Sequence, residues 1–132
     1  MIARLDLTSR AFIGEHCNDM AAAYMLADVV VSASTEPEAF GRVISEAQAM
    51  GRPVVASDHG GMREQVLPGV TAFPFAPGDA EALAQALRQA LLLDGEQRAH
   101  IGQQAVAHVR ANFTKERMCA RTLALYGELL EN

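Results

Sequence analysis

The sequence predicts an α/β fold in which a parallel sheet of about four strands is flanked by helices and followed by a helical C-terminal tail. Short β-branched runs alternate with helical patterns over residues 10–76, and the links between them are short. From residue 79 onward, alanines and leucines recur only at helical spacing. Alternating strands and helices on short links require parallel pairing with right-handed crossovers, which is typical of a doubly wound, Rossmann-like sheet.

Length and composition indicate one domain. The chain has 132 residues, of which half are hydrophobic while only 5% are aromatic, so aliphatic side chains must fill the core. This composition suits helices packed on a sheet. We therefore expect a single domain over residues 1–132, with the sheet core at about residues 10–76 and the helical tail at residues 79–131.

Charge and cysteine content argue against several classes of function. The formal net charge is −5 and there is no run of basic residues, which argues against a nucleic-acid partner. Cys17 and Cys119 show no metal or redox spacing, so no metal site is expected and a reduced, cytoplasmic setting is the simplest account. No stretch reaches the ~18 apolar residues that span a bilayer, so no transmembrane segment is expected. Peripheral membrane contact through a partner stays open.

A strand, a helix and a second strand are expected in the first part of the chain. Residues 11–14 form a short apolar run stopped by glycine, which fits a brief buried strand. Asn18 or Asp19 is a suitable N-cap for a helix that ends near Ala27 and in which alanines supply helix propensity. Residues 28–33 contain three consecutive valines, and a strand that is apolar on both faces belongs in the centre of a parallel sheet.

Glycine and proline divide the next stretch into further elements. Gly51 ends the helix that follows the loop at residues 34–41, and Pro53 is acceptable as the first residue of a strand. Pro68 and Gly69 turn the chain before the last strand. The expected elements are a helix at 42–50, a strand at 53–57, a loop at 58–61, a short helix at 62–66 and a strand at 70–75.

Three helices are expected in the tail. The first begins behind an Asp79 N-cap and carries Glu81 in its first turn, where the helix dipole favours a carboxylate. The second follows Asp94, and the third begins at Thr114. The side chains expected on the buried side of the second helix are Ile101, Ala105, Val106 and Val109.

Two loops are expected to meet at one edge of the sheet. Residues 34–41 and 58–61 each follow a strand, and ligands of such sheets bind beyond the carboxyl ends of the strands. Gly41 lies directly before a helix, where glycine lets a ligand approach the backbone and the helix dipole favours an anion. A diphosphate group is therefore the expected ligand. Taken alone, Gly60 and Gly61 could simply form a turn.

Glu46 and Glu38 are candidate ligands for the sugars on either side of a diphosphate. Glu46 lies about five residues into its helix, ~7–8 Å from the helix start, which suits the reach from a phosphate to an attached ribose. A carboxylate there accepts two hydrogen bonds from adjacent ribose hydroxyls. The alternative for Glu46 is a solvated carboxylate that pairs with Arg42 one turn earlier. The alternative for Glu38 is a solvated loop residue.

The stretch from Thr35 to Glu64 resembles a known signature. Its sequence is TEPEAFGRVISEAQAMGRPVVASDHGGMRE, in which Glu38 and Glu46 are separated by seven residues and precede a Gly-Arg-Pro-Val-Val strand and a Ser-Asp-His-Gly-Gly loop. This pattern is similar to that of the C-terminal, donor-binding domain of retaining glycosyltransferases with GT-B architecture, the group 1 or family 4-like enzymes. The resemblance covers nearly the whole chain, from about residue 11 to residue 130.

The resemblance implies a role for individual residues. Glu38 contacts hydroxyls of the donor sugar and is the catalytic residue, Glu46 holds the nucleotide ribose, and backbone N–H groups at the helix start bind the diphosphate. His59 is expected to be a loop residue, although the frequent role of histidine as an acid or base also makes it a candidate. No cofactor and no metal is implied. The implied donor-binding residues are Glu38, Ala39, Phe40, Gly41, Arg42, Val43 and Glu46, and the implied pocket-shaping residues are Asp58, Gly60, Gly61 and Glu64.

The activity implied by the resemblance is hexosyl transfer with retention, from a nucleotide-diphosphate sugar to an unknown acceptor. Family members hold the acceptor in a preceding domain and neutralise the donor phosphates with basic residues that this sequence does not match. The isolated chain is therefore expected to be inactive and to need an N-terminal acceptor domain, which another polypeptide can supply. The alternatives are a noncatalytic nucleotide-sugar binding or interaction module and a related sugar-nucleotide epimerase fragment.

Overall fold

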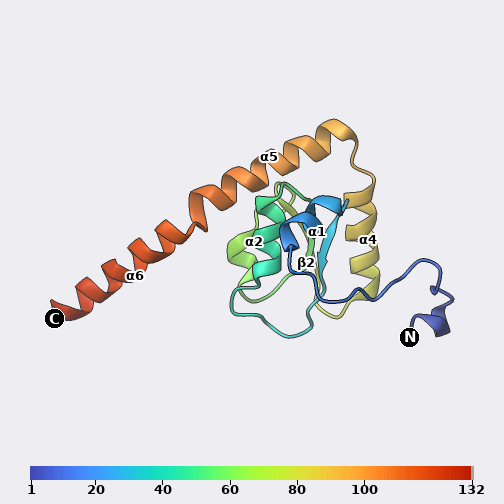
Figure 1. Ribbon diagram of the computed structural model, residues 1–132, viewed down its shortest axis with the longest axis horizontal. Coiled ribbons are helices and arrows are strands. Elements are labelled where there is room, and N and C mark those ends of the chain that lie inside the picture. Colours follow the sequence, from blue (N-terminus) through green and yellow to red (C-terminus); the bar gives the residue numbers. More distant parts are fainter. Residues whose placement is uncertain (132) are drawn as a thin grey trace.

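The computed structural model describes residues 1–131 and shows a parallel sheet with helices on both faces (Figure 1). Three strands are present in this part of the chain, which confirms the predicted α/β class. The strands are β1 (Val30–Ser32), β2 (Val54–Ser57) and β3 (Ala72–Phe75), in the order β1-β2-β3. The helices are η1 (Ala3–Leu5), α1 (Met20–Leu26), α2 (Arg42–Ala49), α3 (Met62–Gln65), α4 (Ala80–Leu91), α5 (Gly95–Asn112) and α6 (Lys115–Leu130).

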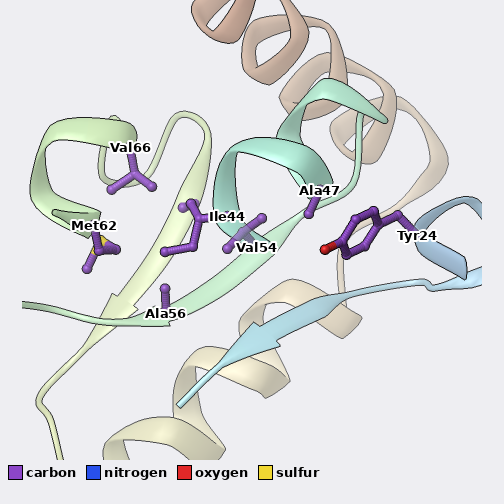
Figure 2. Close-up of a cluster of buried hydrophobic side chains, with 8 residues drawn as sticks. Tyr24, Ile44, Ala47, Val54, Ala56, Met62 and Val66 are labelled. Atoms are coloured by element: carbon purple, nitrogen blue, oxygen red, sulfur yellow. The ribbon is translucent and has the colours of Figure 1, made fainter. Parts of the chain in front are cut away.

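The strand β2 carries the centre of the core. All four of its residues are buried, and alternate side chains point to opposite faces of the sheet. Val54 and Ala56 pack on the face covered by α1, α2 and α3, as Figure 2 shows. Val55 packs on the other face, together with Phe75 and Ala86. The first cluster consists of Tyr24, Ile44, Ala47, Val54, Ala56, Met62, Val66 and Ala72.

Two details of the predicted sheet are wrong. Residues 11–14 form no strand, and Phe12 and Ile13 are 82% and 89% exposed. The strand predicted at residues 28–33 to be central is instead the edge strand β1, in which Val31 is 41% exposed. Both differences have one physical cause, because an apolar run becomes a buried strand only where neighbouring backbones pair with it. Within residues 1–131, β1 pairs only with β2.

The last three helices have different environments. α4 packs on β2 and β3, α5 packs on α2, and α6 extends away from the body of the molecule (Figure 1). A Cβ on Gly102 of α5 would lie 2.6 Å from the carbonyl oxygen of Gly51, so the α2–α5 contact requires glycine. None of the residues of α6 is buried. On α5, the predicted buried side is confirmed, with Val106 half-buried and Ile101, Ala105 and Val109 buried.

No helix in residues 1–131 is both long enough and apolar enough to cross a bilayer.

Candidate functional site

The loops that follow β1 and β2 touch each other at the carboxyl edge of the sheet. The backbone N–H of Gly61 donates to the carbonyl oxygen of Glu38 at 2.9 Å. A Cβ on Gly60 would lie 2.6 Å from the same oxygen, and Gly60 has a φ of +57°. Only glycine therefore lets the two loops approach this closely. The role of these glycines in shaping a ligand pocket stays a prediction.

The first turn of α2 has no side-chain cap. Gly41 is its N-cap residue with a φ of +73°, and the first turn contains no acidic residue. In contrast, Asp19, Asp79, Asp94 and Thr114 cap the starts of α1, α4, α5 and α6. The first N–H groups of a helix have no partner inside the helix, and the dipole adds positive potential there. No side chain forms a capping hydrogen bond at the start of α2, so its N–H groups can bind a phosphate group.

Glu38 lies beside the start of α2. A Cβ on Gly41 would lie 2.9 Å from Oε2 of Glu38, so the carboxylate rests against the backbone of the N-cap residue. Glu38 shares a recess of about 10 Å³ with Ser34, Phe40 and His59, and this volume has room for roughly one water molecule. His59 donates from Nε2 to the carbonyl oxygen of Ser34 at 2.9 Å, while its buried Nδ1 has no partner among the described residues. A carboxylate and an imidazole nitrogen thus lie next to the uncapped start of α2.

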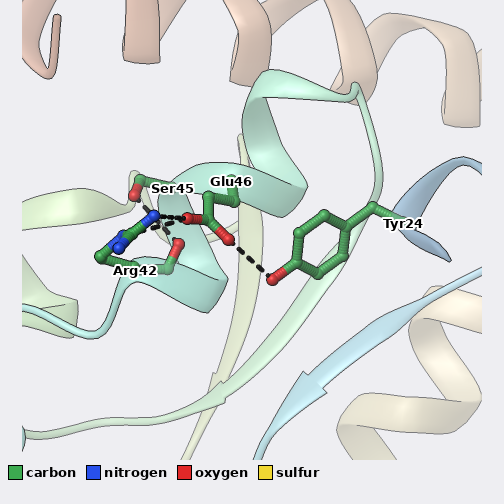
Figure 3. A network of polar contacts seen from close by, with 4 residues as sticks. All are labelled: Tyr24, Arg42, Ser45 and Glu46. Carbon is green, nitrogen blue, oxygen red and sulfur yellow. Dashed lines mark hydrogen bonds and ion pairs between the residues drawn. The ribbon is translucent and has the colours of Figure 1, made fainter. Parts of the chain in front are cut away.

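Glu46 lies one turn into α2, and both of its carboxylate oxygens are engaged (Figure 3). The hydroxyl of Tyr24 donates to Oε2 at 3.0 Å. Arg42 donates to Oε1 from Nη2 at 2.7 Å and from Nε at 3.0 Å, which is the pairing that the sequence left open as an alternative. The side chain of Arg42 is 83% exposed and that of Glu46 is 33% exposed. Water competes for such an ion pair, so Arg42 can leave it at little energetic cost.

A groove of about 650 Å³ between α1 and α2 gives a ligand access to Glu46. Its apolar lining includes Met20, Val43 and Met50, and its polar groups include Tyr24 and Glu46. Burial, and then the hydrogen bond to Glu46, raises the pKa of Tyr24 above its ordinary value, so the hydroxyl stays protonated and donates. An apolar groove with a few convergent polar groups is typical of a small-molecule site.

The remaining predicted site residues lie at the rim of this region or outside it. Asp58 accepts a hydrogen bond at Oδ1 from Nε of Arg63 at 2.8 Å, and the side chain of Arg63 is 65% exposed. Glu64 is exposed and lines neither the recess nor the groove. The structure therefore brings Glu38 and Glu46 to the start of α2, and it directs Asp58 toward α3 instead.

Two contacts at the site were missed by sequence reasoning. Tyr24 was not among the predicted site residues, yet its hydroxyl donates a hydrogen bond to Glu46. The available indication was chemical, because a buried tyrosine hydroxyl normally needs a hydrogen-bond partner. Phe113, which follows α5, meets the ring of Phe40 edge-on at a centroid distance of 5.7 Å. No local pattern indicates this contact between residues far apart in the sequence.

No cluster of three or more His, Cys, Asp or Glu side chains in residues 1–131 is arranged to hold a metal ion.

The parallel α/β sheet and its flanking helices superpose on solved glycosyltransferases, so the domain has the fold of the GT-B glycosyltransferases. The chain belongs to the group 1 glycosyl transferases, because the model of that family matches residues 1–108. The lipopolysaccharide core biosynthesis mannosyltransferase LpcC of Rhizobium leguminosarum bv. viciae is 39% identical over 98 residues, which are 74% of this chain and 28% of that protein. A D-inositol 3-phosphate glycosyltransferase of Corynebacterium glutamicum is 36% identical over 115 residues, which are 87% of this chain and 27% of that protein.

Solved structures agree with this assignment. A glycosyltransferase from Rickettsia africae superposes with a TM-score of 0.92 at 37% identity, and the match covers 99% of this chain and 35% of that chain. HepE from Anabaena, in complex with UDP, superposes with a TM-score of 0.85 at 35% identity, covering 93% of this chain and 34% of that chain. The present chain thus spans about a third or less of these relatives, and it corresponds to their C-terminal domain.

Proposed function

We propose that this chain is a donor-binding domain that holds a nucleotide-diphosphate sugar for glycosyl transfer with retention. The observation that carries the proposal is the placement of Glu38 and Glu46 on either side of the uncapped start of α2. HepE from Anabaena has been crystallised with UDP-glucose and is 36% identical, which supports a nucleotide sugar as the ligand class.

The proposed ligand follows the first turn of α2. Its diphosphate binds the backbone N–H groups between Phe40 and Val43, where the dipole favours an anion. Its ribose enters the groove beside Glu46, and its base lies against the apolar wall of that groove. The recess at Glu38 is too small for a hexose, so the transferred sugar lies above it with the carboxylate at its floor.

Transfer requires more positive charge than this chain provides. The departing nucleoside diphosphate develops negative charge, which cations or helix N-termini must stabilise. Among the residues that line the groove or the Glu38 recess, Arg42 is the one lysine or arginine. We therefore infer that the isolated chain binds the donor but transfers its sugar slowly, and that activity needs an acceptor domain. We place this activity in the cytoplasm, with any membrane contact made through a partner.

Calorimetric titration of the 132-residue chain tests donor binding. UDP, GDP, ADP and UDP-glucose form the panel, and the expected result is binding by at least one of them that Glu46→Gln weakens about tenfold, since a hydrogen bond to a carboxylate is worth roughly 1.5–3 kcal/mol. Absence of binding at millimolar concentration across the panel would overturn the proposal.

A noncatalytic binding module is the second candidate, and it is favoured because Arg42 is the one lysine or arginine among the residues that line the groove and the recess. The test is release of UDP from UDP-glucose by the isolated chain. Turnover that disappears in Glu38→Gln would exclude the noncatalytic module. The identity of the released sugar separates transfer or hydrolysis from epimerisation.

A further inference from the structure

We propose that Tyr24 is a positioning residue, whose hydroxyl fixes the carboxylate of Glu46 so that one edge of it receives the ribose hydroxyls of the nucleotide. The inference rests on the proposed function and adds to it a residue from α1, which lies outside the double-glutamate pattern. Its consequence is selectivity for ribonucleotides over 2′-deoxyribonucleotides.

Tyr24 is anchored in the core while its hydroxyl reaches the groove. The residue is 5% exposed, and it belongs to the same buried cluster as Ile44, Ala47 and Val54 (Figure 2). The ring points from α1 toward α2, and its oxygen meets Oε2 of Glu46 at 3.0 Å (Figure 3). Moving the ring would disturb close-packed neighbours. The hydroxyl is therefore a fixed donor at the wall of the proposed ribose site.

The two hydrogen-bond partners of Glu46, Arg42 and Tyr24, differ in how easily a ligand can displace them. A carboxylate offers about four acceptor positions, of which Arg42 occupies two on Oε1 and Tyr24 occupies one on Oε2. The side chain of Arg42 is 83% exposed and exchanges readily with water or a ligand. Adjacent ribose hydroxyls can therefore replace Arg42, while the bond from Tyr24 persists and sets the orientation of the carboxylate.

A purely structural role for Tyr24 predicts a different outcome. Phenylalanine retains the ring and its packing, so a structural hydroxyl would affect stability, or would affect all nucleotides equally. A positioning hydroxyl affects most strongly those ligands whose binding uses both ribose hydroxyls. The ratio of affinities for a ribonucleotide and its 2′-deoxy counterpart therefore separates the two roles.

The experiment measures dissociation constants by calorimetry on the full chain. The probes are UDP, GDP and ADP, each with its 2′-deoxy counterpart. The proteins are the wild type, Tyr24→Phe, Glu46→Gln and the double variant. For the ribonucleotide that binds, Tyr24→Phe should weaken affinity about 5–10-fold, and for its deoxy counterpart less than about 2-fold. In the Glu46→Gln background, Tyr24→Phe should change neither affinity by more than about 2-fold, because the two residues act as one unit.

Two further variants complete the test. Tyr126→Phe alters the chain's other tyrosine, which is 59% exposed on α6, and should leave all affinities unchanged. Arg42→Leu removes the other partner of Glu46 without touching the core, and it should retain the preference for ribose. A preference for ribose that Tyr24→Phe leaves undiminished, or that disappears in Arg42→Leu, overturns the proposal. Failure of the wild type to bind any probe is a separate result, because it overturns the proposed function itself.

Discussion

Replacing Gly60 with alanine should destabilise the chain for two reasons, the positive φ of this residue and its close approach to the loop of Glu38. In Gly60→Ala, the new Cβ lies 2.6 Å from the carbonyl oxygen of Glu38, and the residue must keep a φ of +57°. A positive φ costs a residue other than glycine about 1–2 kcal/mol. Forcing packed segments apart costs roughly 1–3 kcal/mol more. We therefore expect Gly60→Ala to lower the free energy of unfolding by about 2–5 kcal/mol.

Other glycines of the chain separate the two contributions. Gly78 has a φ of +76° with nothing within 4 Å of an added Cβ, so Gly78→Ala carries the conformational penalty alone, about 1–2 kcal/mol. Gly61 has a φ of −63°, but an added Cβ meets the Ala39 carbonyl group and lies 2.8 Å from Cα of Phe40. Gly61→Ala therefore carries the contact penalty alone. Gly14→Ala carries neither and should leave stability nearly unchanged.

Urea unfolding followed by circular dichroism measures the four free energies, and calorimetry with UDP measures binding. Gly60→Ala and Gly61→Ala should weaken binding as well, because both displace the loop of Glu38, whereas Gly78→Ala should not. The reasoning is refuted if alanine at Gly60 and Gly61 destabilises the chain no more than alanine at Gly78. In that case the close approach of the two loops would not hold Glu38 in place.

Three further predictions concern single features. Glu46→Gln should lower the free energy of unfolding by less than about 1 kcal/mol in urea titrations, since its ion pair with Arg42 is exposed. Removing residues 115–132 should shift the thermal midpoint by less than about 2 °C in a calorimetric scan, because no residue of α6 is buried. Burial, and then the bond to Glu46, raises the pKa of Tyr24 above 10.0 in the folded chain. Its contribution to stability should therefore be complete below about pH 10 and decline at higher pH, where the unfolded chain loses the phenolic proton first. Urea titrations at pH 9 and pH 11 should show this loss in the wild type and not in Tyr24→Phe.

The two valine-rich strands show which features of the sheet can be predicted from sequence and which cannot. The prediction for residues 53–57 agrees with β2, because Val54 and Val55 occupy opposite buried faces and their neighbours on both sides are strands. Residues 28–33 have the same pattern, yet β1 is an edge strand. A strand's own residues report the hydrophobicity of its two faces. They do not report which backbones lie beside it, so its position in the sheet could not be derived.

In the candidate site too, some features could be predicted from the sequence and others could not. The placement of Glu38 and Glu46 around the start of α2 could be predicted, because a single helix start separates them and its geometry is fixed by the backbone. The bond between Tyr24 and Glu46 depends on how α1 packs against α2, and the contact between Phe40 and Phe113 depends on the end of α5. These are tertiary contacts, which periodicity and capping patterns do not encode.

Arg42 links the two halves of the proposed site. It lies in the first turn of α2, where the helix dipole disfavours a cation, and Glu46 compensates for this in the free chain. In the proposed complex, the diphosphate supplies the compensating negative charge, so Arg42 can leave Glu46 just where the ribose of the same nucleotide arrives. A nucleoside without phosphates must break the same ion pair without that compensation. Arg42→Leu should therefore weaken the binding of UDP, strengthen the binding of uridine, and narrow the calorimetric difference between them. If Arg42→Leu leaves the difference in affinity between UDP and uridine unchanged, Arg42 does not couple the binding of the diphosphate to the binding of the ribose.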